Sequence, residues 1–198
     1  MKKHRLKALF YLALFCGLRE GELLALKWSD IDLNNKTLSV NKSLRYVTLI
    51  KSDGSKKREM VIQTPKSETS IRTIFLDDNL IPILEDHKKL KESEKLKAGD
   101  IYNNSDFVFT TALGLNIDPR NLLRAYKRVL TKAEIPYRKF HSLRHTCATK
   151  LFERNTPLTA VQNTLGHSDI KITNDIYTHV MAKKKIETAN KLNDLFIE

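Results

Sequence analysis

Apolar side chains recur at a helical period in the first part of this chain, with polar residues between them. Over residues 4–16 the apolar positions fall three or four residues apart, which predicts a helix with one buried face. The apolar members of this pattern are Leu6, Leu9, Phe10, Ala13 and Cys16. Gly17 ends or bends that helix, and residues 20–26 predict a second, shorter one. Arg19 is therefore expected at the junction of two helices.

A period of two, typical of β-strands, follows in the middle of the chain. Alternating or β-branched residues predict strands at 37–41, 44–51, 59–64 and 71–76. Turn-forming residues separate them at 52–55 and at 67–70. Because the second turn joins two predicted strands, Lys66 is expected at the tip of a hairpin, where its side chain reaches outward.

The remaining sequence is mainly helical in pattern. Asp77 or Asp78 is expected to cap a charged helix that runs to about residue 96, and Pro119 fits the first turn of a helix over 118–133. Further helices are predicted at 141–153, 157–165 and 182–195, and a short strand at 107–110. The expected fold class is α+β, mainly helical with a small antiparallel sheet, and residues 1–198 are expected to form one domain.

The charge of the chain favours a polyanionic partner. It has 35 Lys and Arg against 23 Asp and Glu, which gives a net charge of +12. Nucleic acid is the first candidate for such a partner. Charge alone fits a basic soluble protein with no nucleic-acid partner equally well.

No stretch of the sequence predicts a membrane span or a secretion signal. The longest apolar run, residues 8–18, is far shorter than the roughly 20 residues that a span needs. Cys16 and Cys147 have neither metal-ligand nor redox spacing, so they are expected to be buried and reduced. We therefore expect a cytoplasmic protein without a membrane partner.

Five short motifs occur in a fixed order. They are Gly17-Leu18-Arg19-Glu20-Gly21-Glu22-Leu23, Thr64-Pro65-Lys66-Ser67, His141-Ser142-Leu143-Arg144-His145, Leu165-Gly166-His167-Ser168-Asp169 and Ile176-Tyr177-Thr178-His179. Together they resemble the catalytic domain of the tyrosine recombinases, the phage integrase family, from about residue 4 to about residue 190. The Lys-, Ile- and Asn-rich composition is most similar to that of integrases of Gram-positive phages and conjugative transposons.

The resemblance implies that Arg19 and Arg144 clamp the phosphate of a DNA strand. A catalyst without metal must offset the charge of the phosphodiester with fixed cations, and arginine donates two parallel hydrogen bonds to a phosphate. The alternative for either residue is a solvated cation on a helix surface.

Tyr177 is the implied nucleophile, and its attack leaves a covalent 3′-phosphotyrosine. The ester keeps the energy of the broken bond, so the strand can be rejoined without ATP. A phenol has a pKa of about 10, so attack near neutral pH needs a base and a cationic setting. The alternative is a core or surface tyrosine.

The resemblance gives the proton transfers to His141 and Lys66. His141 is implied as the acid–base partner, three residues before Arg144 on one helix face. His167 is implied as a further hydrogen-bond donor to the phosphate, and Lys66 as the acid that protonates the leaving 5′ oxygen. An exposed turn lysine is the alternative for Lys66.

No metal and no cofactor are expected at this site. His141 and His145 are four residues apart, as in a helical zinc site, but position 142 is Ser instead of the Glu of that motif. His145 is expected to support the site, and His179 to support it or simply to be exposed. Glu22 is the expected partner of an arginine.

The resemblance also implies partners and missing parts. The expected partner is double-stranded DNA, bound by a synaptic tetramer of protomers, and the C-terminal helix is a candidate for exchange between protomers. The core-binding and arm-binding domains of the family are expected to lie outside this chain. Two readings stay open beside site-specific recombination: a type IB topoisomerase that relaxes supercoils, and a DNA-binding fragment that is catalytically idle.

Overall fold

The computed structural model describes residues 4–50, 52–64, 70–166 and 170–194. The helices of these residues are α1 (Lys7–Phe15), α2 (Glu20–Ala25), α3 (Ile81–Ala98), α4 (Pro119–Lys132), α5 (Ser142–Glu153), α6 (Leu158–Leu165) and α7 (Ile170–Asp194). The strands are β1 (Ile31–Asp32), β2 (Thr37–Val40), β3 (Ser43–Ile50), β4 (Lys56–Gln63) and β5 (Arg72–Phe75). Short 3-10 turns precede β1 and flank α3. The α+β fold class with small antiparallel sheets, predicted from the sequence, is confirmed.

The larger sheet has the strand order β1-β2-β5, and both pairings are antiparallel. Leu38 of β2 lies opposite Ile74 of β5, and both side chains are buried. Along β5 and the residue after it, Ile74 and Leu76 face the core while Phe75 between them is exposed. Arg72 therefore occupies an inward position at the end of the strand, because side chains two apart share one face.

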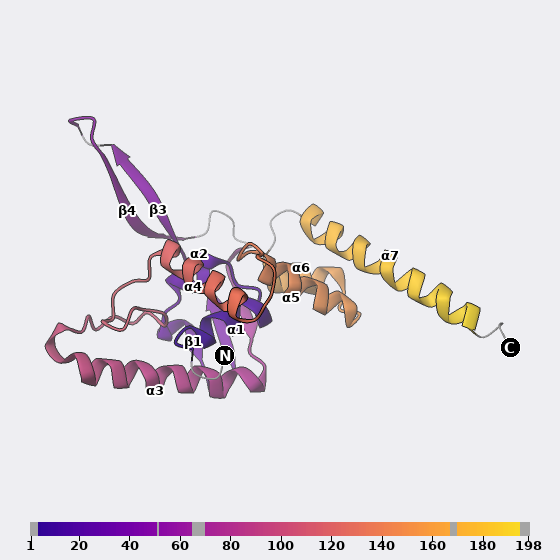
Figure 1. The fold of residues 1–198 in the computed structure, drawn as a ribbon, viewed down its shortest axis with the longest axis horizontal. Helices are drawn as coiled ribbons and strands as arrows, with labels where there is room; N and C mark the ends of the chain where they lie inside the picture. Colours follow the sequence, from indigo (N-terminus) through magenta and orange to yellow (C-terminus); the bar gives the residue numbers. More distant parts are fainter. Residues whose placement is uncertain (1–3, 51, 65–69, 167–169, 195–198) are drawn as a thin grey trace.

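The strands β3 and β4 form a separate hairpin that projects from the body of the molecule (Figure 1). They pair over their whole length, from Ser43 opposite Gln63 to Ile50 opposite Lys56. The predicted turn at 52–55 lies at the tip. At the base, α2 packs against β3 so closely that a Cβ on Gly21 would lie 2.4 Å from Ser43 Oγ.

Two of the predicted elements are wrong. Residues 107–110 form no strand, because Phe107 and Thr110 make only isolated bridges, to Lys27 and Asn116. The strands on either side of Lys66 do not form one hairpin, since β4 pairs with β3 whereas β5 pairs with β2.

The C-terminal helix begins earlier than the sequence pattern indicates. The expected start is near residue 182, but α7 begins at Ile170, and Tyr177 lies inside it. Before residue 182 weak helix formers such as Asn174 and Thr178 lie among the apolar residues, and contacts with α5 and α6 stabilise this part of the helix.

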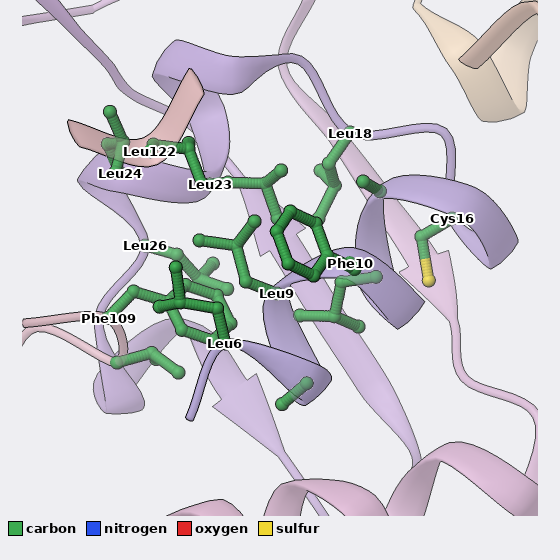
Figure 2. Packing of buried hydrophobic residues seen from close by; sticks show 14 of the residues in the cluster. Leu6, Leu9, Phe10, Cys16, Leu18, Leu23, Leu24, Leu26, Phe109 and Leu122 are labelled. Carbon is green, nitrogen blue, oxygen red and sulfur yellow. The ribbon is translucent and has the colours of Figure 1, made fainter. Parts of the chain in front are cut away.

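The main core lies around α1 and α2, whose apolar residues pack on the sheet, on α3 and on α4. Figure 2 shows Leu9 and Phe10 of α1 beside Leu23 of α2; Leu9 and Leu23 are fully buried. A second, smaller cluster joins α5, α6 and α7 through residues such as Phe152, Leu165 and Val180. Among the described helices, none has the length and apolarity that a bilayer span would need.

Candidate functional site

Arg19 lies at the start of α2, at the predicted junction of two helices. Its backbone N–H donates to Glu22 Oε2 at 2.8 Å, which satisfies an N–H that the helix itself leaves unpaired. Its Nη1 donates to Glu22 Oε1 at 2.8 Å, and its Nη2 donates to the carbonyl of Gly166 at 2.9 Å. The side chain remains 34% exposed, so this guanidinium is fixed but open to an anion.

Arg144 reaches the same place from α5, and it is only 2% exposed. Its Nη1 donates to the carbonyl of Gly17 at 2.8 Å, and its Nη2 donates to the carbonyl of Leu165. Burial, and after it the charge of Arg19, lower the pKa of Arg144 to about 9, which leaves the guanidinium protonated at neutral pH. The structure thus brings Arg19 and Arg144 together from segments 125 residues apart.

Gly17 is required for this approach. It has a φ of +62°, which side-chain-bearing residues rarely adopt. A Cβ at this position would lie 2.3 Å from Leu165 Cδ2 and 3.7 Å from Arg144 Cγ. A side chain at this position would therefore strain the backbone and force the Leu165 side chain of α6 to move.

Glu22 is the anion at the centre of the cluster. It is 5% exposed, and it accepts hydrogen bonds from Arg19 and, at 3.2 and 3.0 Å, from both Nη atoms of Arg72. Burial would raise the pKa of Glu22, but the hydrogen bonds from Arg72 and Arg19 hold it below its ordinary value. The expectation that Glu22 partners an arginine is confirmed, and there are two such arginines.

His141 lies at the N-terminal end of α5, near Arg144, and it borders an open hollow of about 360 Å³. Partial burial, followed by the charges of His145, Arg144 and Arg19, lowers the pKa of His141. At neutral pH the imidazole is therefore neutral and able to accept a proton. His145 is exposed, with its ring centroid 5.0 Å from that of His141.

The hollow beside His141 is also lined by Arg19 and by Arg45 of β3. Arg45 is exposed and comes from the base of the projecting hairpin. Two cations and a neutral imidazole thus surround a space large enough for a phosphate and part of its sugar. This arrangement can bind an anion and exchange a proton with it.

Tyr177 is held in a different environment, by apolar side chains. Its ring packs edge-on against Phe152 of α5, with the centroids 5.3 Å apart, and belongs to the cluster of α5, α6 and α7. Phe152 is eight residues beyond Arg144 on α5, roughly 12 Å along the helix axis at 1.5 Å per residue. The contacts described for Tyr177 are those of this apolar cluster.

Two of the predicted site residues, Lys66 and His167, lie outside the described residues. His179 is exposed on α7. Cys16 and Cys147 are buried and unpaired, as expected, and burial raises the pKa of their thiols to about 12 and about 11. In the described ranges, no three His, Cys, Asp or Glu side chains gather as metal ligands would.

The sequence interpretation assigned no role to Arg72 or Arg45. A signal for Arg72 was present, because it shares the inward face of its strand with Ile74 and Leu76, and an inward arginine needs a buried partner. Nothing comparable marked Arg45, since its importance comes from how β3 packs beside α2.

The sequence model of the phage integrase family matches residues 1–184. A tyrosine recombinase XerC-like protein of Caldanaerobacter subterraneus subsp. tengcongensis is 52% identical over 200 residues, which cover 100% of this chain and 51% of that protein. The integrase of Staphylococcus phage L54a is 34% identical over 184 residues, 90% of this chain and 49% of the integrase. The chain therefore spans about half the length of these curated relatives.

Solved structures of recombinases have a fold similar to that of this chain. The Tn1549 transposon integrase in complex with circular intermediate DNA has a TM-score of 0.69 and 21% identity, with coverage of 93% of this chain and 60% of that one. XerA recombinase has a TM-score of 0.68 and 22% identity, with coverage of 94% and 59%. The fold that these proteins share is therefore also the fold of this chain.

Proposed function

Since the chain belongs to the phage integrase family, we propose that it carries out the strand cleavage and rejoining of a site-specific DNA recombinase. The observation that carries this proposal is that Arg19 and His141 line one hollow, while Arg144 is held next to Arg19 on the neighbouring carbonyl of α6. The DNA complexes of the Tn1549 integrase support a DNA partner. The basic charge of the chain is consistent with that partner.

In this proposal the arginines bind the non-bridging oxygens of one phosphate. The phenol of Tyr177 attacks the phosphorus while its proton passes to His141. The bond from phosphorus to the 5′ oxygen breaks, and Lys66 protonates that oxygen. A strand whose 3′ end is esterified to Tyr177 results, and attack by a 5′ hydroxyl reverses the steps. His167 adds a hydrogen bond to the phosphate, and neither metal nor ATP takes part.

Tyr177 packs on Phe152, which lies about two turns beyond Arg144 on α5, roughly 12 Å along the helix axis. In this proposal the phenol moves from that apolar contact toward the arginines before it attacks. We therefore propose that binding of DNA, or of neighbouring protomers, repositions the segment around Tyr177. A synaptic tetramer that exchanges the C-terminal helix is one arrangement that would do so. Such an enzyme would work in the cytoplasm, where bacterial DNA lies.

The test is capture of the covalent intermediate. The chain is incubated with a pool of nicked duplexes of randomised sequence, from which the cleaved fragment diffuses away and prevents rejoining. We expect a protein–DNA adduct that denaturation does not disrupt and that mass mapping places on Tyr177. Tyr177→Phe should form no adduct, whereas Tyr137→Phe, a change at an exposed tyrosine, should form as much as the parent. Equal adduct from Tyr177→Phe would refute the proposed chemistry.

Two outcomes separate the alternatives. Relaxation of a supercoiled plasmid at arbitrary sequence would favour a type IB topoisomerase over a recombinase. DNA binding without any adduct on the randomised pool would favour an idle DNA-binding fragment.

A further inference from the structure

Three arginines from three separate segments donate to three consecutive carbonyls at the end of α6. Arg72 Nε donates to Thr164 at 2.8 Å, Arg144 Nη2 donates to Leu165, and Arg19 Nη2 donates to Gly166 at 2.9 Å. The last carbonyls of a helix have no partner within it and carry partial negative charge. One basic side chain is a common cap for such an end, and three in succession exceed what helix termination needs.

Arg72 differs from Arg19 in having almost no exposed face. Its side chain is 6% exposed, against 34% for Arg19. Its three nitrogens bond to Thr164, to both oxygens of Glu22, and to the carbonyl of Ser70. It cannot reach a DNA phosphate without breaking these bonds, so its charge acts within the protein.

The contacts of Arg72 bear directly on Arg19. Glu22 Oε1 lies 2.8 Å from Arg19 Nη1 and 3.2 Å from Arg72 Nη1, so one oxygen is shared between the two guanidinium groups. Without Arg72, Glu22 Oε2 would keep only the backbone N–H of Arg19 as a partner and could also take the second terminal nitrogen of Arg19. The arginine that the hollow presents to a phosphate would then be turned toward the protein interior.

We propose that Arg72 is a positioning residue, which holds Glu22 and the end of α6 so that Arg19 remains directed at the hollow beside Arg144. This role rests on the proposed function, because it assigns the hollow to the phosphate that Tyr177 attacks. It also joins β5, α2 and α6 at one point, so that the arginines move as a unit when α6 moves.

The first experiment compares Arg72→Gln with the parent on the nicked-duplex pool. The rate of adduct formation at saturating DNA should fall about a hundredfold, the scale of a misplacement of about 1 Å in a reacting group. The affinity for duplex DNA, measured by fluorescence anisotropy at fixed salt, should change less than about twofold because no phosphate contact is lost. Arg72→Lys should be intermediate, since it keeps the charge and loses the fork that binds Glu22.

Arg5→Gln is the matched control. Arg5 also forms a two-pronged pair, with Glu94 at 2.7 and 2.8 Å, and donates to the carbonyl of Thr110, but it lies away from the hollow. Its loss should lower the free energy of unfolding without lowering the adduct rate. An equal fall in rate for Arg5→Gln would show that general destabilisation explains the Arg72 result and would overturn the proposal.

A double variant tests the mechanism itself. If Arg72 acts by restraining the Glu22 carboxylate, then adding Glu22→Gln to Arg72→Gln removes the charge that pulls on Arg19. The double variant should therefore form adduct faster than Arg72→Gln alone. A double variant that is as slow as the single one, or slower, would overturn the proposed route through Glu22.

Titration with inorganic phosphate separates failure of this proposal from failure of the proposed function. In the parent, phosphate should shift the Nε–H NMR signals of Arg19, and in Arg72→Gln or Arg72→Lys that response should weaken severalfold. A weakened response in a protein that forms no adduct would support the positioning role and reject only the recombinase chemistry. An unchanged Arg19 response would reject the positioning role, whatever the adduct assay gives.

Discussion

The arginine cluster and the tyrosine-bearing helix α7 differ in what holds their functional side chains. Arg19 and Arg144 are fixed by directional hydrogen bonds to backbone carbonyls and, for Arg19, to a buried carboxylate. Tyr177 is held by the edge of an aromatic ring and by aliphatic neighbours. Figure 1 shows the same division in the fold: the arginine-bearing elements lie in the body, whereas α7 extends from it.

This contrast shows which part of the proposed site is preorganised. Donors that are fixed before the reaction stabilise charge without reorganising, so they suit the binding of a phosphate. Apolar packing is not directional, and one aromatic pair contributes about 0.5–1.5 kcal/mol beyond its buried area. A nucleophile held in this way is released at small cost. The division predicts a rigid phosphate site and a movable tyrosine.

Loss of Arg144 should produce the largest effect. Arg144→Ala removes a fixed donor, which typically costs about 10²–10³ in rate, and leaves the carbonyls of Gly17 and Leu165 without this partner. Adduct formation on the nicked pool should be lost while most non-specific DNA affinity remains. Arg154→Ala, at an exposed arginine at the end of the same helix, serves as the control. Adduct at the parental rate from Arg144→Ala would refute its role.

A smaller and opposite effect is expected where the tyrosine is packed. Phe152→Leu weakens the contact with the Tyr177 ring, so the rate of adduct formation should rise about two- to tenfold, in line with the energy of an aromatic pair. Nitration of Tyr177, followed by mass spectrometry, should also become faster. Phe109→Leu, in the main core, controls for lost stability and should leave nitration unchanged. Slower adduct formation would mean that Phe152 holds Tyr177 in a productive position.

The smallest expected effect is on how the rate of adduct formation falls at acidic pH. Because the pKa of His141 is lowered from 6.5, the neutral form persists below that pH, and the adduct rate should fall only at more acidic values. His145→Gln removes one cause of the lowering, so the acidic limb should move to higher pH. If the acidic fall in the adduct rate occurs at the same pH in His145→Gln as in the parent, another group takes the proton from Tyr177.

The lowered pKa of His141 also makes the stability of the folded chain depend on pH. The unfolded chain takes up a proton on His141 at its ordinary pKa, whereas the folded chain takes it up only at lower pH. The free energy of unfolding should therefore decrease as pH falls below 6.5. Rates are accordingly compared well below the melting temperature at each pH.

Most elements of the fold were predictable because local pattern and tertiary structure agree. The helix pattern before Gly17, the cap at Asp118 and the stop at Gly166 are all present, each with a short-range cause. The start of α7 was not predictable, because helix propensity around Tyr177 is modest and packing on α5 and α6 decides it. The pairing of β5 with β2 was also missed, since strand partners depend on long-range register.

The residue types of the candidate site followed from the motifs, but their interactions did not. The sequence placed Arg19 at a helix junction and gave Glu22 an arginine partner. It could not show that Arg72 shares that carboxylate, because a residue 50 positions away meets it only after β5 has joined the sheet. It also could not show that Tyr177 packs on Phe152, since its spacing from the preceding motif does not fix the path of α7.

The arginine cluster can assemble only late in the synthesis of the chain, because its acceptors are the carbonyls at the end of α6. Gly166 is bound by an arginine 147 positions earlier, and Thr164 by one 92 positions earlier. Chains emerge from the ribosome N-terminus first, so both guanidinium groups are made long before their acceptors. A nascent or prematurely terminated polypeptide that stops before α6 lacks these acceptors and has no assembled cluster. Such an incomplete product would carry Arg19 and Arg72 without the acceptors that hold them together.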